Sequence, residues 1–177
     1  MAIVTPTFRP SRPPRRRLCL AWLASAPLAW RAGHAATLVP GALLPTIALE
    51  DQHGKPVHVD GSTRRLVYTA ERSVGDMVSK LLAAQPAGVL GRLNAVYVAD
   101  ISAMPAFITR MFALPKMREL PFSIALVRDS AEQAQVSDLP RQPGAATVLL
   151  LEEGRVSEIL LPHNETQLRL ALGLPAA

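Results

Sequence analysis

Cysteine is almost missing from this chain. The 177 residues include one, Cys19, which lies in an apolar stretch near the N-terminus. From Ala36 onward there is no thiol, so this part of the chain can form no disulfide, no cysteine-ligated metal site and no thiolate nucleophile. This absence excludes thiol redox chemistry and cysteine-dependent hydrolysis for residues 36–177.

Acidic side chains are missing from the first 35 residues. That stretch holds six of the 19 Lys and Arg side chains and no Asp or Glu, which leaves 13 basic against 14 acidic residues from Ala36 onward. The net charge of +5 and the isoelectric point near 10.1 therefore come from the N-terminus. Because the remainder is close to neutral, the interpretation as a nucleic-acid-binding protein loses its main support, and we expect no nucleic-acid partner.

The same 35 residues contain the three parts of a secretory signal. A basic stretch, RPSRPPRRR, precedes the apolar residues 18–30, and small residues follow at Gly33 and Ala35. This pattern predicts cleavage between Ala35 and Ala36, a signal peptide over residues 1–35 and a periplasmic domain over residues 36–177. Membrane contact is then expected only through the leader during export, by a Sec or a twin-arginine route.

An uncleaved leader is the alternative, and it would make the protein a membrane-anchored scaffold. The apolar run is shorter than a permanent transmembrane helix requires, which favours cleavage.

Phosphate-binding glycine loops and hydrolase motifs are also missing. The chain has no Gly-x-Gly-x-x-Gly, no Walker pattern and no Gly-x-Ser-x-Gly. The histidines after residue 35, His53, His58 and His163, lie in no hydrolase pattern, so Ser73 has no identifiable base. We expect no catalytic residue, no cofactor and no metal. An oxidoreductase of another class, using a flavin or metal without such a motif, is the alternative.

The part after the leader is long enough for one domain and contains no internal repeat. Apolar runs predict strands, and helical periodicity predicts intervening helices. The strands are expected in residues 43–51, 55–59, 64–70, 93–100, 121–129, 144–152 and 155–161. The helices are expected in residues 73–83, 102–120, 130–140 and 163–173. The alternation indicates a mixed sheet with helices on both faces.

Local signals mark several of the boundaries. Ser73 and Asp76 form a Ser-x-x-Asp pattern typical of a helix start, and Asn164 with Gln167 predicts another. Glu153 and Gly154 predict a hairpin turn. Pro115 is expected to interrupt or restart the helix that contains it.

Four segments together resemble the thioredoxin-like superfamily, especially secreted thiol–disulfide oxidoreductases and peroxiredoxins. They are GALLPTIALEDQHGKPVHV, RRLVYTAERSVGDMVSKLL, LPFSIALVRDSAEQAQVSDL and GAATVLLLEEGRV, in the family's order. The resemblance covers residues 41–172. It implies an α/β, thioredoxin-like three-layer fold, with a mixed central sheet, helices on both faces and an N-terminal β-hairpin.

The chain departs from that family where the family's chemistry occurs. Residues 69–76 stand where the reactive cysteines are expected, and Ala145-Ala146 stands where a cis-proline is expected. The fold is therefore implied, and no catalytic residue is carried over. We expect a non-catalytic module that binds a protein or small ligand in a crevice lined by Glu71, Arg72, Ser73, Asp76, Asp100, Ala146 and Thr147.

The turn over residues 69–76, between a predicted strand and a predicted helix, has two interpretations. Its free amides, helped by Arg72 and Arg110, could bind an anion. The favoured interpretation is a capped, solvated turn, since two nearby acids oppose an anion.

The methionines also have two interpretations. Met77, Met104, Met111 and Met117 suggest thioether ligands for Cu(I), but their helical spacing beside phenylalanines is more typical of core. If the helix in residues 102–120 exposes its Met and Phe side chains, it is expected to be a partner-docking surface.

Overall fold

The computed structural model describes residues 37–175, so the predicted signal peptide, its cleavage site and Cys19 lie outside the described residues. Seven strands form one mixed sheet in the order β2-β1-β5-β4-β3-β6-β7. Their bounds are β1 Ile47–Asp51, β2 Pro56–Val59, β3 Arg65–Thr69, β4 Ala95–Asp100, β5 Ala125–Val127, β6 Thr147–Glu152 and β7 Arg155–Leu160. β1 and β2 form the expected N-terminal hairpin.

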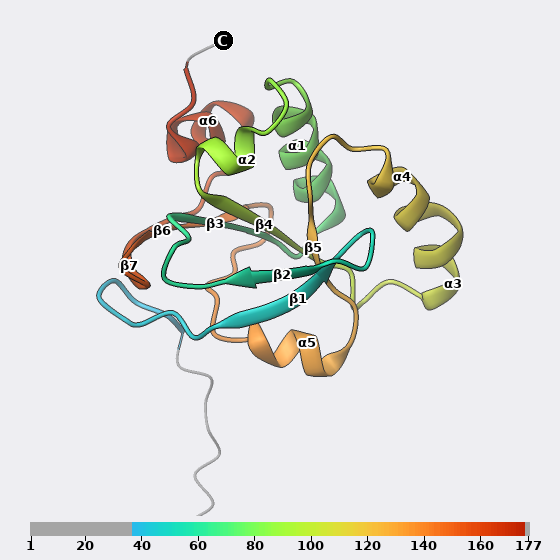
Figure 1. The fold of residues 1–177 in the computed structure, drawn as a ribbon, viewed down its shortest axis with the longest axis horizontal. Helices are drawn as coiled ribbons and strands as arrows, with labels where there is room; N and C mark the ends of the chain where they lie inside the picture. Colours follow the sequence, from blue (N-terminus) through green and yellow to red (C-terminus); the bar gives the residue numbers. More distant parts are fainter. Residues whose placement is uncertain (1–36, 176–177) are drawn as a thin grey trace, which may run out of the picture. The chain divides into compact units, whose positions relative to one another are not determined.

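The helices lie on both sides of this sheet, as expected (Figure 1). Their bounds are α1 Arg72–Ala83, α2 Val89–Arg92, α3 Ala106–Ile108, α4 Leu114–Arg118, α5 Ser130–Gln135 and α6 Glu165–Leu172. A π-helical turn, η1 (Thr109–Ala113), joins α3 to α4. We call the continuous helical stretch over residues 106–118 the α3–α4 segment. None of the helices in residues 37–175 is both long and apolar enough to cross a membrane.

Strand β3 shows how the sheet divides two hydrophobic cores. Leu66 and Tyr68 belong to the core beside α5, whereas Val67 belongs to the core under α1 and α6. All three side chains are buried, because β3 lies between β4 and β6 and is covered on both faces. Such burial explains the uninterrupted apolar run that predicted this strand.

The predicted hairpin turn and helix cap near the C-terminal end of the chain are confirmed. Glu153 and Gly154 have φ angles of 49° and 77°, the left-handed pair that a two-residue hairpin turn needs. Asn164 accepts a hydrogen bond from the Gln167 N–H and begins α6, and Gly173 ends it in the left-handed region.

The predicted cap at Ser73 was wrong. α1 begins at Arg72, its N-cap is Glu71, and no side chain caps it. Ser73 is thus already inside the helix, since β3 ends at Thr69 and the chain needs only Ala70 and Glu71 to turn.

Pro115 does restart its helix, as expected. It lies at the beginning of α4, directly after the wide π-helical turn. Proline has no N–H to donate to the carbonyl one turn back, and its ring crowds that carbonyl, so the preceding turn widens. No residue of the α3–α4 segment is fully buried.

Candidate functional site

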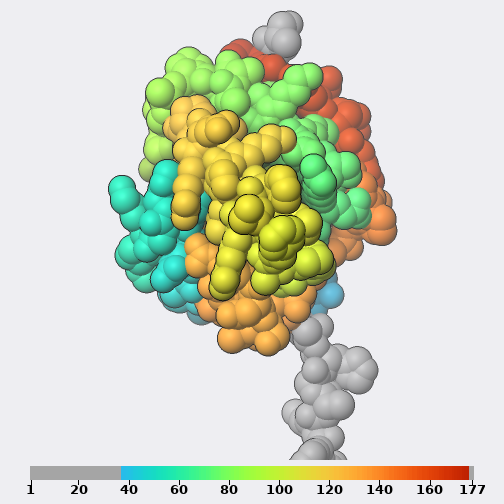
Figure 2. All heavy atoms as spheres, turned by 90° about the vertical axis from the view of Figure 1, so that its right-hand side faces the viewer, coloured from blue at the N-terminus to red at the C-terminus, as the bar shows by residue number. Residues whose placement is uncertain are grey.

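A pocket of about 650 Å³ lies between α1 and the α3–α4 segment, at the carboxyl ends of β3 and β4. Figure 2 shows the α3–α4 segment, in yellow, lying across one face of the molecule next to α1, in green. Most of the lining is apolar, and the largest apolar side chains are Ile101, Met104, Ile108, Phe112, Met117, Leu120 and Ile124. This size is typical of pockets that hold small molecules.

Three hydroxyl side chains line the pocket, those of Thr69, Ser79 and Tyr97. Thr69 Oγ1 and Tyr97 Oη lie 3.2 Å apart, and the Tyr97 hydroxyl is 3.4 Å from the carbonyl oxygen of Gly75, to which it donates. Burial raises the pKa of Tyr97, so the phenol stays protonated. Since Thr69 and Tyr97 bond to one another, these two hydroxyls make little demand for a polar ligand.

Charged side chains surround the mouth of the pocket. Asp76 lies 4.0 Å from the Nε of Arg72 and 3.9 Å from the Nζ of Lys116, and all three side chains are exposed. Lys80 also lines the pocket. Ion pairs this long and this exposed contribute little to stability, so these groups are free to meet a ligand.

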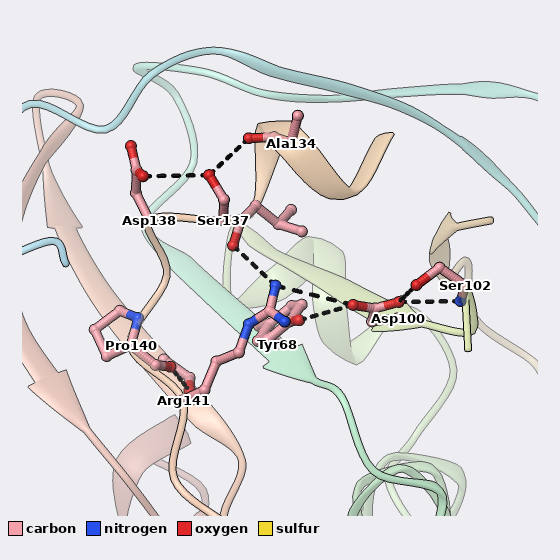
Figure 3. A network of polar contacts seen from close by, with 10 residues as sticks. Tyr68, Asp100, Ser102, Ala134, Ser137, Asp138, Pro140 and Arg141 are labelled. Atoms are coloured by element: carbon pink, nitrogen blue, oxygen red, sulfur yellow. Dashed lines mark hydrogen bonds and ion pairs between the residues drawn. The ribbon is translucent and has the colours of Figure 1, made fainter. Parts of the chain in front are cut away.

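Asp100 lies at the edge of the pocket in a buried polar network (Figure 3). Its carboxylate accepts a hydrogen bond from the Tyr68 hydroxyl at 3.1 Å and two from Ser102, from the N–H at 3.0 Å and the hydroxyl at 2.6 Å. Arg141 lies 3.9 Å from the same carboxylate and stacks over the Tyr68 ring, with its guanidinium 5.2 Å from the ring centroid. Asp100 is therefore already satisfied by the protein.

The structure brings together four of the seven residues predicted for the crevice. Glu71, Arg72, Asp76 and Asp100 line the pocket, and Ser73 does not. Whether these residues contact a ligand stays a prediction.

Ala146 and Thr147 lie outside the pocket lining and are buried at the start of β6. The Ala146 N–H donates to the carbonyl of Pro162, and the Thr147 hydroxyl donates to the carbonyl of Pro140. The loop before them does reach the site, because the Gly144 N–H donates to Glu71 Oε1 at 3.0 Å.

For the half of the site that the α3–α4 segment contributes, the sequence predicted a partner-docking surface only on the condition that its Met and Phe side chains are exposed, and it placed no crevice residue there. Its density of Met and Phe was the available signal, and the interpretation as core was wrong for Met111, which is 59% exposed. Phe107 and Phe112 are exposed as well, whereas Met77 and Met117 pack against the core as expected. No helix or strand of residues 37–175 covers the outer face of the segment, so its apolar side chains line a pocket and a surface.

No protein-family model matches this chain, and no curated protein matches it closely enough to count as a relative. Solved structures do resemble it. The peroxidoxin BcpB from Mycobacterium tuberculosis aligns with a TM-score of 0.50 and 14% identity, covering 77% of this chain and 95% of the other. A thiol:disulfide interchange protein from a Bacteroides species aligns with a TM-score of 0.50 and 11% identity, covering 75% of this chain and 88% of the other. A thio-disulfide isomerase from Thermus thermophilus aligns with a TM-score of 0.47 and 23% identity, covering 78% of this chain and 100% of the other.

The first two likenesses and the mixed sheet confirm the fold expected from the sequence. By fold this is a thioredoxin-like protein. At the strand–turn–helix over residues 69–76 it carries no thiol, and instead it opens into an apolar pocket with a charged mouth.

Proposed function

We propose that the chain is an exported thioredoxin-fold binding protein, without thiol redox activity, that holds a small apolar ligand in the pocket between α1 and the α3–α4 segment. The observation that carries this proposal is the pocket itself. It encloses about 650 Å³, begins at the turn after β3 and continues between two helices lined by apolar side chains.

Exposed hydrophobic groups support a ligand that covers them. Ile108 is 37% exposed and Phe112 is 63% exposed, yet both line the pocket. Leaving large apolar side chains in water costs about 25 cal/mol for each Å² that a ligand could cover. A bound apolar molecule removes part of this surface from water and is stabilised by doing so.

The N-terminal pattern supports export. Basic residues, an apolar run and small residues occur in the order of a cleavable signal, and the part after Ala35 needs no thiol chemistry to act as a carrier or accessory protein. The fold then serves as a rigid scaffold that holds α1 and the α3–α4 segment apart.

A neutral fluorophore tests the proposal. N-phenyl-1-naphthylamine becomes bright in apolar surroundings, so direct excitation during titration of the purified full-length protein is expected to give saturable binding. Ala83 lines the pocket and is exposed, so Ala83→Trp places an indole in the pocket without disturbing the core. We expect Ala83→Trp to weaken binding about ten-fold or more, since it removes volume that the ligand needs.

The neighbouring residue supplies a matched control. Ala84 is also exposed and does not line the pocket, so Ala84→Trp adds the same indole outside it. The control is expected to bind like the parent protein. Absence of saturable binding, or equal weakening in both variants, contradicts the proposed function.

A further inference from the structure

The cations of the pocket mouth suggest what kind of ligand belongs there. The chain has three lysines, and two of them, Lys80 and Lys116, line this one pocket together with Arg72. The third, Lys55, lies in the turn between β1 and β2. Flexible cations at the mouth of an apolar pocket are suited to the anionic head of an amphipathic molecule.

One of the three acids near the mouth is paired with a cation outside the pocket, since Arg141 lies 3.9 Å from the carboxylate of Asp100. Glu71 accepts the Gly144 N–H, which directs its carboxylate to the loop before β6. Because that donor is neutral, Glu71 keeps its charge and still offsets part of the positive charge at the mouth.

Asp76 is shared between Arg72 and Lys116 at 4.0 and 3.9 Å. With Asp100 paired to Arg141, the three cations Arg72, Lys80 and Lys116 face two carboxylates, those of Glu71 and Asp76. The mouth therefore has one positive charge in excess, on side chains that a ligand's head group can reach.

The interior of the pocket selects for an alkyl chain. The hydroxyls of Thr69 and Tyr97 bond to each other and to the carbonyl of Gly75, which leaves Ser79 as the one other hydroxyl side chain of the described pocket lining. In residues 37–175, the buried side-chain nitrogens without a partner belong to Arg65 and Arg128, which do not line the pocket. A sugar or nucleobase would find few groups in the interior to replace its bonds to water, whereas a methylene chain has no such bonds to lose.

We propose that the pocket binds a free, medium-chain alkyl monocarboxylate, with the chain between α1 and the α3–α4 segment and the carboxylate at Lys116, Lys80 and Arg72. This inference rests on the proposed function and adds the head group, its charge and its place. Helical side chains of the α3–α4 segment, chiefly Ile108 and Phe112, contact the chain.

Displacement of bound N-phenyl-1-naphthylamine tests it. Octanoate, decanoate and dodecanoate, each kept below its micelle concentration, are expected to compete with affinity that rises by up to about four-fold for each methylene. Dodecanoate is expected to compete better than methyl dodecanoate or dodecyltrimethylammonium. This advantage is expected to shrink at high salt, because salt screens the attraction between the carboxylate and the cations.

Lysine variants locate the head group. We expect Lys116→Gln to weaken the binding of dodecanoate about two- to five-fold and to leave the binding of methyl dodecanoate unchanged. The double variant with Lys80→Gln and Lys116→Gln is expected to bind dodecanoate more weakly still. Lys55→Gln removes the same charge outside the pocket and is expected to leave both competitors unchanged.

The outcomes distinguish failure of the carboxylate inference from failure of the proposed apolar-ligand function. If the fluorophore binds in the pocket but dodecanoate and methyl dodecanoate compete equally, or Lys55→Gln weakens dodecanoate as much as Lys116→Gln does, the carboxylate inference is overturned and the apolar-ligand function stands. If the fluorophore does not bind, the function itself fails. Displacement of the fluorophore only by phosphatidylglycerol vesicles, with flotation of the protein, also overturns the free-acid inference by assigning the site to a membrane lipid.

Discussion

The carboxylate of Glu71 accepts a hydrogen bond from the backbone N–H of Gly144 at 3.0 Å, across 73 positions of sequence. This bond joins the start of α1 to the loop before β6. It also holds a carboxylate of the pocket mouth in a fixed position against that loop.

Replacing Glu71 tests this link. Glu71→Ala leaves the Gly144 N–H without its partner, and since both groups are near the surface we expect a loss of about 1 kcal/mol in the free energy of unfolding, measured by urea denaturation. Glu119 is an exposed glutamate at the end of α4, with no side-chain hydrogen bond among the described residues. Glu119→Ala is therefore expected to change stability much less, and an equal loss in both variants contradicts the role given to Glu71.

The Tyr68–Asp100 bond predicts a stability change with a distinct alkaline signature. Tyr68→Phe removes a donor to a buried carboxylate, so we expect it to destabilise the protein by about 1–2 kcal/mol near neutral pH. Burial, and then the charge of Asp100, raise the pKa of Tyr68 above its ordinary value of 10.0, despite Arg141 nearby. Above pH 10 Tyr68 ionises in the unfolded chain but not in the folded one, so the parent loses stability as the pH rises, whereas Tyr68→Phe has no phenol at this position and does not lose stability through it.

The difference between parent and Tyr68→Phe is therefore expected to narrow as the pH rises above 10, measured by denaturation at several pH values. The chain's other tyrosine, Tyr97, also has a raised pKa through burial, so both proteins keep a common alkaline slope. A stability difference between the parent and Tyr68→Phe that stays constant above pH 10 contradicts the raised pKa of Tyr68.

Asp51 predicts the opposite dependence at acidic pH. Burial alone would raise the pKa of Asp51, but hydrogen bonds from the N–H groups of Lys55 and His53 and from the Ser123 hydroxyl outweigh it, and the pKa lies below its ordinary value of 3.8. Because the folded pKa is depressed, the carboxylate stabilises the protein above pH 3.8 and loses that effect as the pH falls through the lowered pKa.

Asp51→Asn is accordingly expected to be less stable than the parent at neutral pH, with the gap closing as acid is added. Urea midpoints of the two proteins across the acidic range measure this gap. A gap that is unchanged in acid shows that the ionised carboxylate is not what stabilises the turn between β1 and β2.

The predicted signal peptide gives an expected N-terminus for the proposed exported form. Purification from the periplasm followed by N-terminal sequencing is expected to give a chain that starts at Ala36. Such a chain has no thiol, so its urea midpoint is expected to be the same with and without reductant. A chain that starts at Met1 supports the membrane-anchored alternative instead.

The order of strands and helices was largely predictable, because it depends on local patterns. The apolar runs of β3 and β4, the turn at Gly154 and the cap at Asn164 are each encoded within a few residues. Ser73 shows the limit of such patterns, since the sequence carried a cap signal there but the helix begins at Arg72, with Glu71 as its N-cap.

Half of the candidate site was predictable for the same reason. The turn over residues 69–76 is recognisable from its neighbours along the chain, so Glu71, Arg72 and Asp76 could be named in advance. The other half was not, because a helical Met and Phe pattern is the same whether the face it forms meets the core or an open pocket.

The sequence by itself determined the lack of a thiol after Ala35, the division of charge along the chain and the succession of elements, because composition and short-range periodicity suffice for these. Tertiary structure alone decided that Met111 is exposed, that Lys116 faces Asp76 and that Glu71 is held by Gly144. Each of these depends on how α1, the α3–α4 segment and the loop before β6 pack against one another across the sheet, and no short stretch of sequence carries that information.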